Sequence, residues 1–443
     1  MRCYNLSSFL KYLEGKSFIK YVFNAIIFIY LLFLIIFNLS NFRQASKIFI
    51  NSYAFGHSVI ESSIFFYEYG PTGVCISVGN RKNRNKYLKL LFKPHVLLHF
   101  WLPSLHNINI YQALRLRAHN TIEHFLKKSK IINVIIGKSL CVVDREFLCN
   151  RAAVRNLQQD YRLSEERAAF LLNKFTNAYK VEENAPLASL HYLAQQKTLI
   201  NYSLSGKLTK FNDKFLNRAR SINNSYSSAE LKLCTLVLRR SWKPWSGLGL
   251  DSFYQAIEYL ASKNYLINII GDLEDTDKLK SFNNIYWHKH FNMNPQIFQI
   301  LSIINSSFCI GDQSGVQTLI HFLNKKNLII NSVPFGQLQY NSVVLPRLWT
   351  NKNQVKATSE EHFDRLLFRF HSTKSDKGEM LHPQYYSPKT VLDAVSSFVE
   401  NIEAHNQVEE LYPQQFFKSD PDCMLIFSKN SSFSPILLKE LKI

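Results

Sequence analysis

The residues with the clearest potential for chemistry form a turn between an apolar strand and a helix. Gly311-Asp312-Gln313-Ser314-Gly315 follows the apolar run Phe308-Cys309-Ile310, and a helical pattern from Val316 to Leu323 begins directly after it. Backbone N–H groups at a helix N-terminus, beside a glycine and a serine hydroxyl, can bind a phosphate. Glycine and serine are equally common in ordinary strand-to-helix turns. The turn on its own therefore favours the ordinary interpretation.

Two arginines, Arg239 and Arg240, end another predicted strand, Leu233 to Leu238. Successive strand residues alternate sides, so one of the two can point into a crevice while the other faces a neighbouring layer or solvent. A guanidinium there would neutralise a diphosphate through bidentate hydrogen bonds. The alternative is a solvated strand end in a basic protein. Because Ser314 belongs to the same predicted sheet, we give the two interpretations equal weight.

A third candidate group lies near the N-terminus, where Phe55-Gly56-His57 is predicted to form a turn and Glu61 follows one helical turn later. If this turn faced a second domain, His57 could serve as a general base. The alternative, a histidine satisfied at a domain interface, is favoured on the sequence alone.

Short acidic and histidine patterns do not predict a metal site. The two Asp-x-Asp matches are better explained as solvated loops, and neither histidine pair has an evident third or fourth ligand. These patterns are Asp275 with Asp277, Asp420 with Asp422, His288 with His290, and His95 with His99. P-loop, nucleophile-elbow and dinucleotide fingerprints do not occur, which argues against NTPases, α/β-hydrolases and dinucleotide oxidoreductases.

The elements that must position these residues alternate between strand and helix. In the first half, predicted strands at 48–54 and 73–79 flank a helix at 59–69 and form a βαβ unit. The second half repeats the alternation, which predicts an α/β fold with two doubly wound, Rossmann-like domains whose ligands bind at the carboxyl ends of the strands. Three polar turns, at Arg239, at Gly271-Asp272 and at Gly311, lie at such ends. The predicted elements of the second half are strands 233–238, 266–270, 308–310 and 328–330 and helices 252–262, 295–304 and 316–323.

The stretch 21–42 contains no charged residue. A helix of this length covers about 33 Å, enough to cross a hydrocarbon core. We therefore predict a transmembrane anchor, because apolar residues surround every face; a cleaved signal peptide and a buried core helix are the alternatives. The basic residues before it favour a cytoplasmic N-terminus, and a shallow, non-spanning helix would also account for the pattern.

The length and the net charge of the chain constrain its domain organisation and its partners. With 443 residues and a net charge of +20, the chain is expected to hold two domains and to bind anionic partners. The seven cysteines are scattered, so neither a disulfide framework nor a zinc cluster is indicated. The predicted organisation is a tail at 1–20, the anchor at 21–42, an N-terminal domain with a helical insertion at 43–205, a linker at 206–230, a C-terminal domain at 231–405 and a tail at 406–443.

The pattern of these pieces resembles a family of bacterial glycosyltransferases of the GT-B type found with surface-polysaccharide genes. The matching pieces are Phe55-Gly56-His57, Val237-Leu238-Arg239-Arg240, Tyr265 to Asp272, Ile310 to Gly315 with Asn331-Ser332-Val333-Pro334, Tyr386-Ser387-Pro388, and Ser434-Pro435. Two departures stand out: a second arginine where the family has a small or acidic residue, and Asp312-Gln313 where it has small hydroxyl residues.

The resemblance implies two domains facing a cleft, a nucleotide-sugar donor as substrate, a glycan or lipid-linked acceptor, and neither a cofactor nor a metal. It implies that Arg239 or Arg240 offsets the charge of the departing diphosphate, with His57 or Glu61 as the base. The donor would contact Gly56, Asp272, Gly311, Gln313, Ser314 and Gly315.

Nucleic acid is not an expected partner, and the catalytic part is expected in the cytoplasm if the source is bacterial. The alternative function is a non-enzymatic, membrane-tethered basic protein that binds anionic lipid or polysaccharide, for example through the basic run at 81–86.

Overall fold

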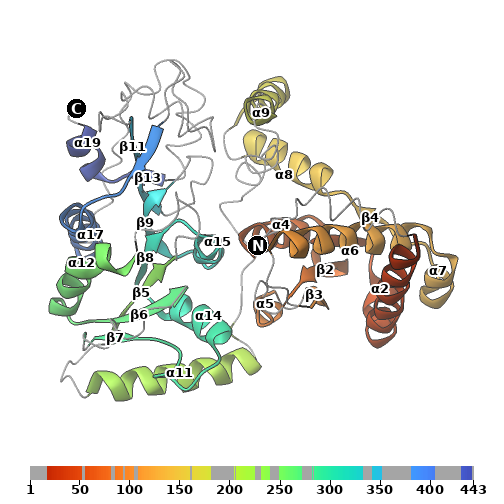
Figure 1. Cartoon of the computed structure of the whole chain (residues 1–443), viewed down its shortest axis with the longest axis horizontal. Coiled ribbons are helices and arrows are strands. Elements are labelled where there is room, and N and C mark those ends of the chain that lie inside the picture. The colour runs from red at the N-terminus through yellow and green to blue at the C-terminus, as the bar shows by residue number, and fades with distance from the viewer. Residues whose placement is uncertain are drawn as a thin grey trace. The chain divides into compact units, whose positions relative to one another are not determined.

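The chain divides into two compact α/β units, the first up to Cys149 and the second taking the described residues from Asn150 onward (Figure 1). Each is built on a parallel sheet, which confirms the α/β prediction; the predicted cleft stays a prediction. The computed structural model describes residues 17–51, 55–80, 85–92, 95–103, 108–159, 162–180, 204, 206–224, 231–239, 249–271, 282, 284–332, 342–351, 381–404 and 431–441.

The first unit is a four-stranded sheet with strand order β3-β2-β1-β4, and every pair in it is parallel. The chain order reverses between β1 and β4, as a doubly wound sheet requires. Its elements are α2 (Ser17–Phe37), α3 (Leu39–Gln44), β1 (Lys47–Asn51), α4 (Phe55–Tyr69), η1 (Gly70–Thr72), β2 (Gly73–Gly79), α5 (Leu88–Leu91), β3 (Val96–Trp101), α6 (Ile108–Lys128), α7 (Lys130–Ile136), β4 (Val142–Val143) and the start of α8 (Arg145–Gln159).

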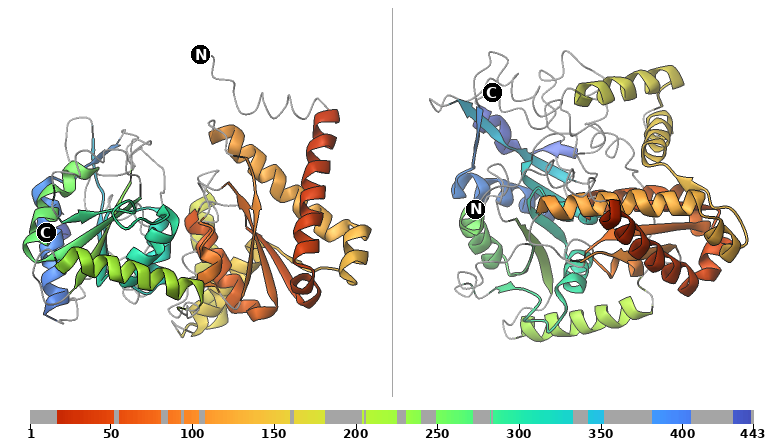
Figure 2. Two further views of the ribbon diagram at one scale, coloured as in Figure 1. Left: turned by 90° about the horizontal axis from the view of Figure 1, so that it is seen from below. Right: turned by 45° about the vertical axis from the view of Figure 1, so that its right-hand side comes forward.

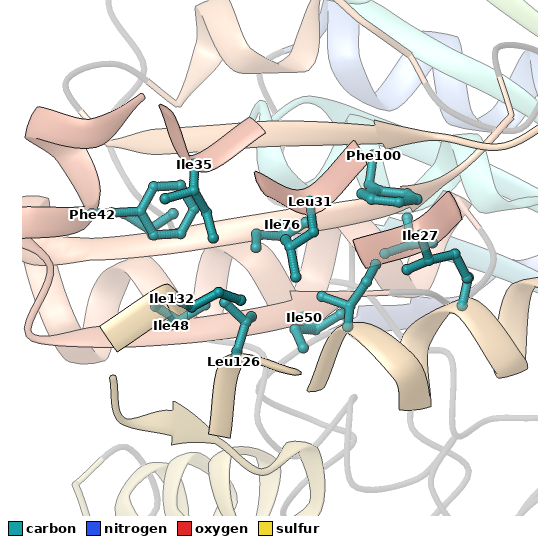
Figure 3. Close-up of a cluster of buried hydrophobic side chains, with 14 of the residues drawn as sticks. Ile27, Leu31, Ile35, Phe42, Ile48, Ile50, Ile76, Phe100, Leu126 and Ile132 are labelled. Carbon is teal, nitrogen blue, oxygen red and sulfur yellow. The ribbon is translucent and has the colours of Figure 1, made fainter. Parts of the chain in front are cut away.

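Helices cover both faces of this sheet (Figure 2) because its strands are apolar on both sides. Ile48 and Ile76 belong to a buried cluster with residues of α2 and α6 (Figure 3). Phe49, one residue along, stacks instead on Phe65 of α4 at 5.4 Å between ring centroids. Alternation along the strands thus assigns α2 and α6 to one face and α4 to the other.

The structure does not support the predicted transmembrane anchor. Nowhere in the described ranges does a helix combine the length and the apolar character needed to cross a bilayer. In α2, Ile27, Leu31 and Ile35 are buried against the sheet and α6. Thr121 of α6 also donates a hydrogen bond to the side chain of Asn24 at 3.2 Å. One face of α2 therefore packs into the core of the first unit.

The second unit is a seven-stranded sheet with order β13-β10-β9-β8-β5-β6-β7, again with every pair parallel. Strands β11 and β12 form a separate antiparallel pair. Its elements are the rest of α8, α9 (Glu165–Lys180), α11 (Lys207–Asn224), β5 (Lys232–Leu238), α12 (Leu250–Ser262), β6 (Tyr265–Gly271), β7 (Ile285–Tyr286), α14 (Pro295–Asn305), β8 (Phe308–Asp312), α15 (Gly315–Phe322), β9 (Lys326–Ser332), β10 (Ser342–Pro346), β11 (Leu348–Asn351), β12 (Leu381–Gln384), α17 (Pro388–Glu403), β13 (Ser431–Phe433) and α19 (Pro435–Leu441).

Two predicted boundaries differ from the structure. The predicted linker at 206–230 contains the long helix α11, because Leu208, Phe215 and Ile222 recur at helical spacing and are buried. Phe215 stacks on Phe291 at 4.7 Å, which fixes α11 to the second unit. The predicted tail at 406–443 contains β13, which extends the sheet beside β10, and the helix α19.

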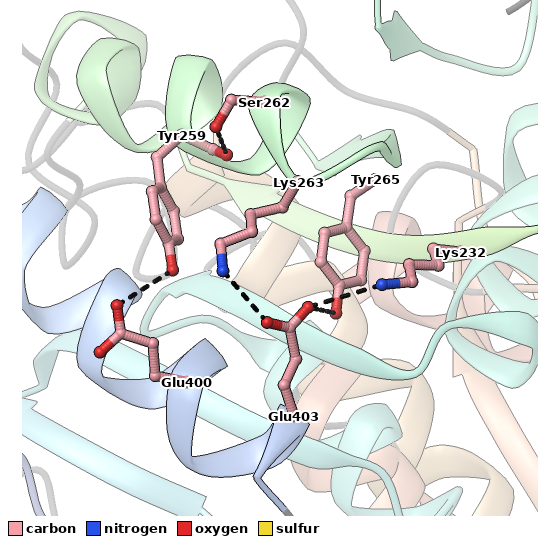
Figure 4. A network of polar contacts seen from close by, with 7 residues as sticks. All are labelled: Lys232, Tyr259, Ser262, Lys263, Tyr265, Glu400 and Glu403. Atoms are coloured by element: carbon pink, nitrogen blue, oxygen red, sulfur yellow. Dashed lines mark hydrogen bonds and ion pairs between the residues drawn. The ribbon is translucent and has the colours of Figure 1, made fainter. Parts of the chain in front are cut away.

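A polar network at the amino ends of β5 and β6 holds α17 in place (Figure 4). The Glu403 carboxylate accepts hydrogen bonds from Tyr265 and Lys263, each at 3.3 Å, and pairs with Lys232 at 3.6 Å. Burial, with help from Glu403, raises the pKa of Tyr265. These contacts lie at the edge opposite to the carboxyl ends, so we assign them to the stability of the sheet.

Candidate functional site

The carboxyl ends of β10, β9, β8 and β5 lie next to one another along one edge of the second sheet, because all of these strands are parallel. From β5 the chain adds β6 and β7 on one side and then returns to add β8, β9 and β10 on the other. The order thus reverses between β5 and β8. In doubly wound sheets the crevice outside this reversal is where ligands bind.

Two glycines let the backbones approach closely at this edge. Gly311 has φ +149°, and a Cβ there would lie 2.2 Å from the carbonyl oxygen of Val237. Gly271 has φ +106°, and its Cβ would lie 2.0 Å from the carbonyl oxygen of Leu238. A side chain would clash with strand β5 at either position. Glycine is therefore required on both sides of β5 at its carboxyl end.

Arg239 joins the end of β5 to the turn after β8. Its guanidinium donates a hydrogen bond from NH1 to the carbonyl oxygen of Gln313 at 3.0 Å, and its side chain is partly buried. The predicted meeting of an arginine and the serine-glycine turn is thus observed for Arg239. Arg240 and Asp272 lie outside the described residues.

Ser314 caps the N-terminus of α15, where its Oγ accepts a hydrogen bond from the backbone N–H of Val316 at 3.3 Å. Accepting this bond leaves the hydroxyl hydrogen available for a ligand. Side chains of α15 and β9 also fix the turn. The Gln317 amide donates a hydrogen bond to the carbonyl oxygen of Asp312 at 3.1 Å and accepts one from the Asn327 side chain at 2.5 Å. Gly315, the first helical residue, is exposed.

Arg347 is a basic residue at this edge that the sequence analysis missed. It directly follows β10, and only 1 % of its surface is exposed. Its Nε donates to the side chain of Asn331, at the end of β9, at 2.8 Å. Burial lowers the pKa of Arg347 to about 10, while Tyr385 and Asp312 act in the opposite direction. The signal was present, since Arg347 ends an apolar strand as Arg239 does.

In the first unit, Gly56 and His57 lie in the first turn of α4 rather than in a turn before it. Residues 52–54 and the side chain of His57 are not described, so the predicted role of His57 stays a prediction. The backbone places both residues after the carboxyl end of β1, where the order of the first sheet reverses.

The structure places Glu61 in the core of the first unit rather than at an accessible position. The carboxylate is fully buried, and its Oε1 pairs with Arg145 at 2.7 Å from Nε and 2.6 Å from NH2. Arg145 opens α8 just after β4. A buried, charge-paired carboxylate holds α8 against α4 and is poorly suited to remove a proton from an acceptor. This geometry leaves His57 as the candidate base.

The other polar patterns do not assemble a metal site in the part of the chain that the structure describes. His290 accepts a hydrogen bond from the backbone N–H of Trp287 at 3.2 Å. His95 and His99 stack on Phe66 and Trp101. The two Asp-x-Asp matches and the basic residues 81–84 lie outside the described residues.

The sequence matches no family model and no curated protein. Among solved structures it is similar to ADP-heptose LPS heptosyltransferase II of E. coli, at 13% identity and a TM-score of 0.41, over 81% of this chain and 99% of that one. It is also similar to a glycosyl transferase of family 9 from Veillonella parvula DSM 2008, at 11% identity, a TM-score of 0.41 and the same coverage. A third is the E. coli heptosyltransferase WaaC with ADP-2-deoxy-2-fluoro heptose, at 9% identity and a TM-score of 0.35, over 67% of this chain and 92% of that one. At these identities and scores we base the function on this chain's own geometry.

Proposed function

We propose that the protein is a glycosyltransferase of the GT-B type, which moves a sugar from a nucleotide-sugar donor to a glycan or lipid-linked acceptor of a surface polysaccharide. The observation that carries the proposal is the hydrogen bond between Arg239 and the carbonyl oxygen of Gln313, at the reversal of a doubly wound sheet. It places a guanidinium beside a capped helix N-terminus. Both groups favour a diphosphate.

The chemistry follows from the charge that this site accommodates. When the bond between the sugar and the diphosphate breaks, negative charge develops on the diphosphate oxygens. Arg239 and the N–H groups at the start of α15 are fixed before that charge appears, so they stabilise the transition state without reorganising. The acceptor hydroxyl would lose its proton to His57 if the configuration inverts. No metal ion or cofactor is needed in this proposal.

The nucleotide site can be tested by thermal stabilisation of the full chain with UDP, GDP, ADP and CMP. We expect one nucleotide at millimolar concentration to raise Tm, because a ligand that binds only the folded state stabilises it. EDTA should leave this shift unchanged. If none of the four nucleotides raises Tm, the donor site is wrongly assigned.

We further propose that α2 lies in the membrane interface instead of crossing the bilayer. Its buried face is opposite to a row of exposed apolar residues, from Val22 through Ile26, Ile29 and Phe33 to Ile36, with Phe37 81 % exposed beside it. Between Glu14 and Glu61 the sequence has no acidic residue and several basic ones. An apolar row in a positively charged segment suits an anionic lipid surface.

Vesicle sedimentation tests this placement. We expect the full chain to sediment with vesicles of phosphatidylcholine and phosphatidylglycerol, and the double change Phe33→Ser and Phe37→Ser to weaken binding at least tenfold. Phe170→Ser, at a residue of α9 that is as exposed as Phe33, is the control. Equal sedimentation of the double variant and the control would exclude α2 as the lipid contact.

A further inference from the structure

Arg347 is a buried cation that forms no ion pair within 4 Å with any of the described residues, although Asp312 acts on it electrostatically. Its only hydrogen bond in the described part of the chain is the one from Nε to Asn331. NH1 is buried and has no partner there. The ring of Tyr385 lies 5.7 Å from the guanidinium carbon, which offers a cation–π contact but no compensating charge. A buried, unpaired charge is costly, so its presence calls for a ligand of opposite charge.

The backbone next to Arg347 is arranged to hold it. Asn331 has φ +63°, a left-handed conformation that asparagine tolerates better than most residues. Its side-chain oxygen fixes Nε, so the two terminal nitrogens of Arg347 are not used in this contact. A guanidinium fixed at Nε is a pre-oriented donor, since the free end of its planar group matches phosphate oxygens.

The strand order places Arg347 and Arg239 on opposite sides of the Ser314 turn. Arg347 follows β10 and Arg239 follows β5, with β9 and β8 between them. Three strand spacings separate the two outer strands by about 14 Å. Two extended arginine side chains with a diphosphate between them can span that distance. Asp312, at the end of β8, is close enough to influence the Arg347 guanidinium electrostatically.

We propose that Arg347 is a second diphosphate-binding residue, which contacts the donor from the β10 side while Arg239 contacts it from the β5 side. This inference rests on the proposed function. It adds Arg347 to Arg239, which is one of the two arginines that the sequence pattern offered for the diphosphate. The nucleoside part of the donor would not depend on Arg347, because a guanidinium binds phosphate oxygens.

The experiment compares the full chain with Arg347→Gln by calorimetric titration with UDP, GDP, ADP, CMP, the nucleoside of whichever nucleotide binds, and inorganic pyrophosphate. We expect the dissociation constant of the preferred nucleoside diphosphate to rise about 10- to 100-fold in Arg347→Gln, as for loss of a hydrogen bond to a charged group. The affinity for the matching nucleoside should stay unchanged. Lys325→Gln is the matched control, because Lys325 is a partly buried cation at the amino end of β9 that donates to the carbonyl oxygen of Ser306.

Each outcome separates this inference from the proposed function. Equal nucleotide affinity of the wild type and Arg347→Gln overturns the role of Arg347 and leaves the donor site standing. Arg347-dependent binding of pyrophosphate without binding of any nucleotide supports the anion site and overturns the nucleotide-sugar donor. No binding of any probe overturns both. If Arg347→Gln does not fold, Arg347→Lys decides by the same comparison, with an expected loss of about tenfold because an ammonium cannot donate two parallel bonds.

Discussion

Replacing Arg239 with alanine is expected to lower the rate of sugar transfer by about 10²- to 10³-fold while the protein remains folded. The size follows from removing one fixed donor that faces the developing charge of a transition state. The cost to stability should be only about 1 kcal/mol, because the side chain is partly exposed and loses one hydrogen bond, to Gln313. The measurement is release of the nucleotide from the donor that the thermal screen identifies, together with the melting temperature.

The control for Arg239 is Arg218→Ala on α11. Arg218 also donates from its guanidinium to a backbone carbonyl, that of His290 at 2.9 Å, but this carbonyl follows β7, the edge strand two strands beyond β5. We expect it to transfer sugar at the wild-type rate. If both variants are equally active, Arg239 merely ties the turn to β5 and does not act on the diphosphate.

Glu61→Gln is expected to lower the free energy of unfolding by about 3–5 kcal/mol, measured by urea denaturation. The change leaves the Arg145 guanidinium, whose side chain is 10% exposed, without its counter-charge inside the first unit. Glu123→Gln is the matched control. Glu123 pairs with Lys127 on the surface of α6, and such pairs are worth about 1 kcal/mol or less.

A double variant separates the structural role of Glu61 from a catalytic one. Glu61→Leu with Arg145→Met removes both charges and should recover most of the lost stability, because well-packed apolar residues often replace a buried ion pair without cost. Sugar transfer should recover with it. A stable double variant that transfers no sugar would restore Glu61 as the candidate base.

The polar strand ends were predictable because they are local features. An apolar strand that stops at Arg239 or at Gly311 is visible in a few consecutive residues, and the two β5-facing glycines have no room for a side chain. Hydrophobic periodicity predicted β2 and α14 to within one residue for the same reason. The helix α11 inside the predicted linker at 206–230 was not predicted, because its apolar residues are widely spaced instead of forming a continuous run.

The apolar character of α2 was evident from the sequence, but the partner of each face was not. A helix that is apolar on all sides fits lipid and protein core equally well, and composition cannot decide between them. The structure assigns Leu31 and its face to the sheet and leaves Phe33 and its face exposed. An anchor that crosses the bilayer and a helix that lies along it thus share one sequence pattern.

By itself, the sequence determined the alternation of strands and helices and the polar turns that end the strands, because neighbouring residues specify both. Only the tertiary structure decided which ends meet. The Glu61–Arg145 pair joins residues 84 positions apart, and the order β10-β9-β8-β5 brings Arg347 to the edge that holds Arg239. Strand order is set by how whole faces pack and by how the chain returns across the sheet, and no short stretch of residues encodes it.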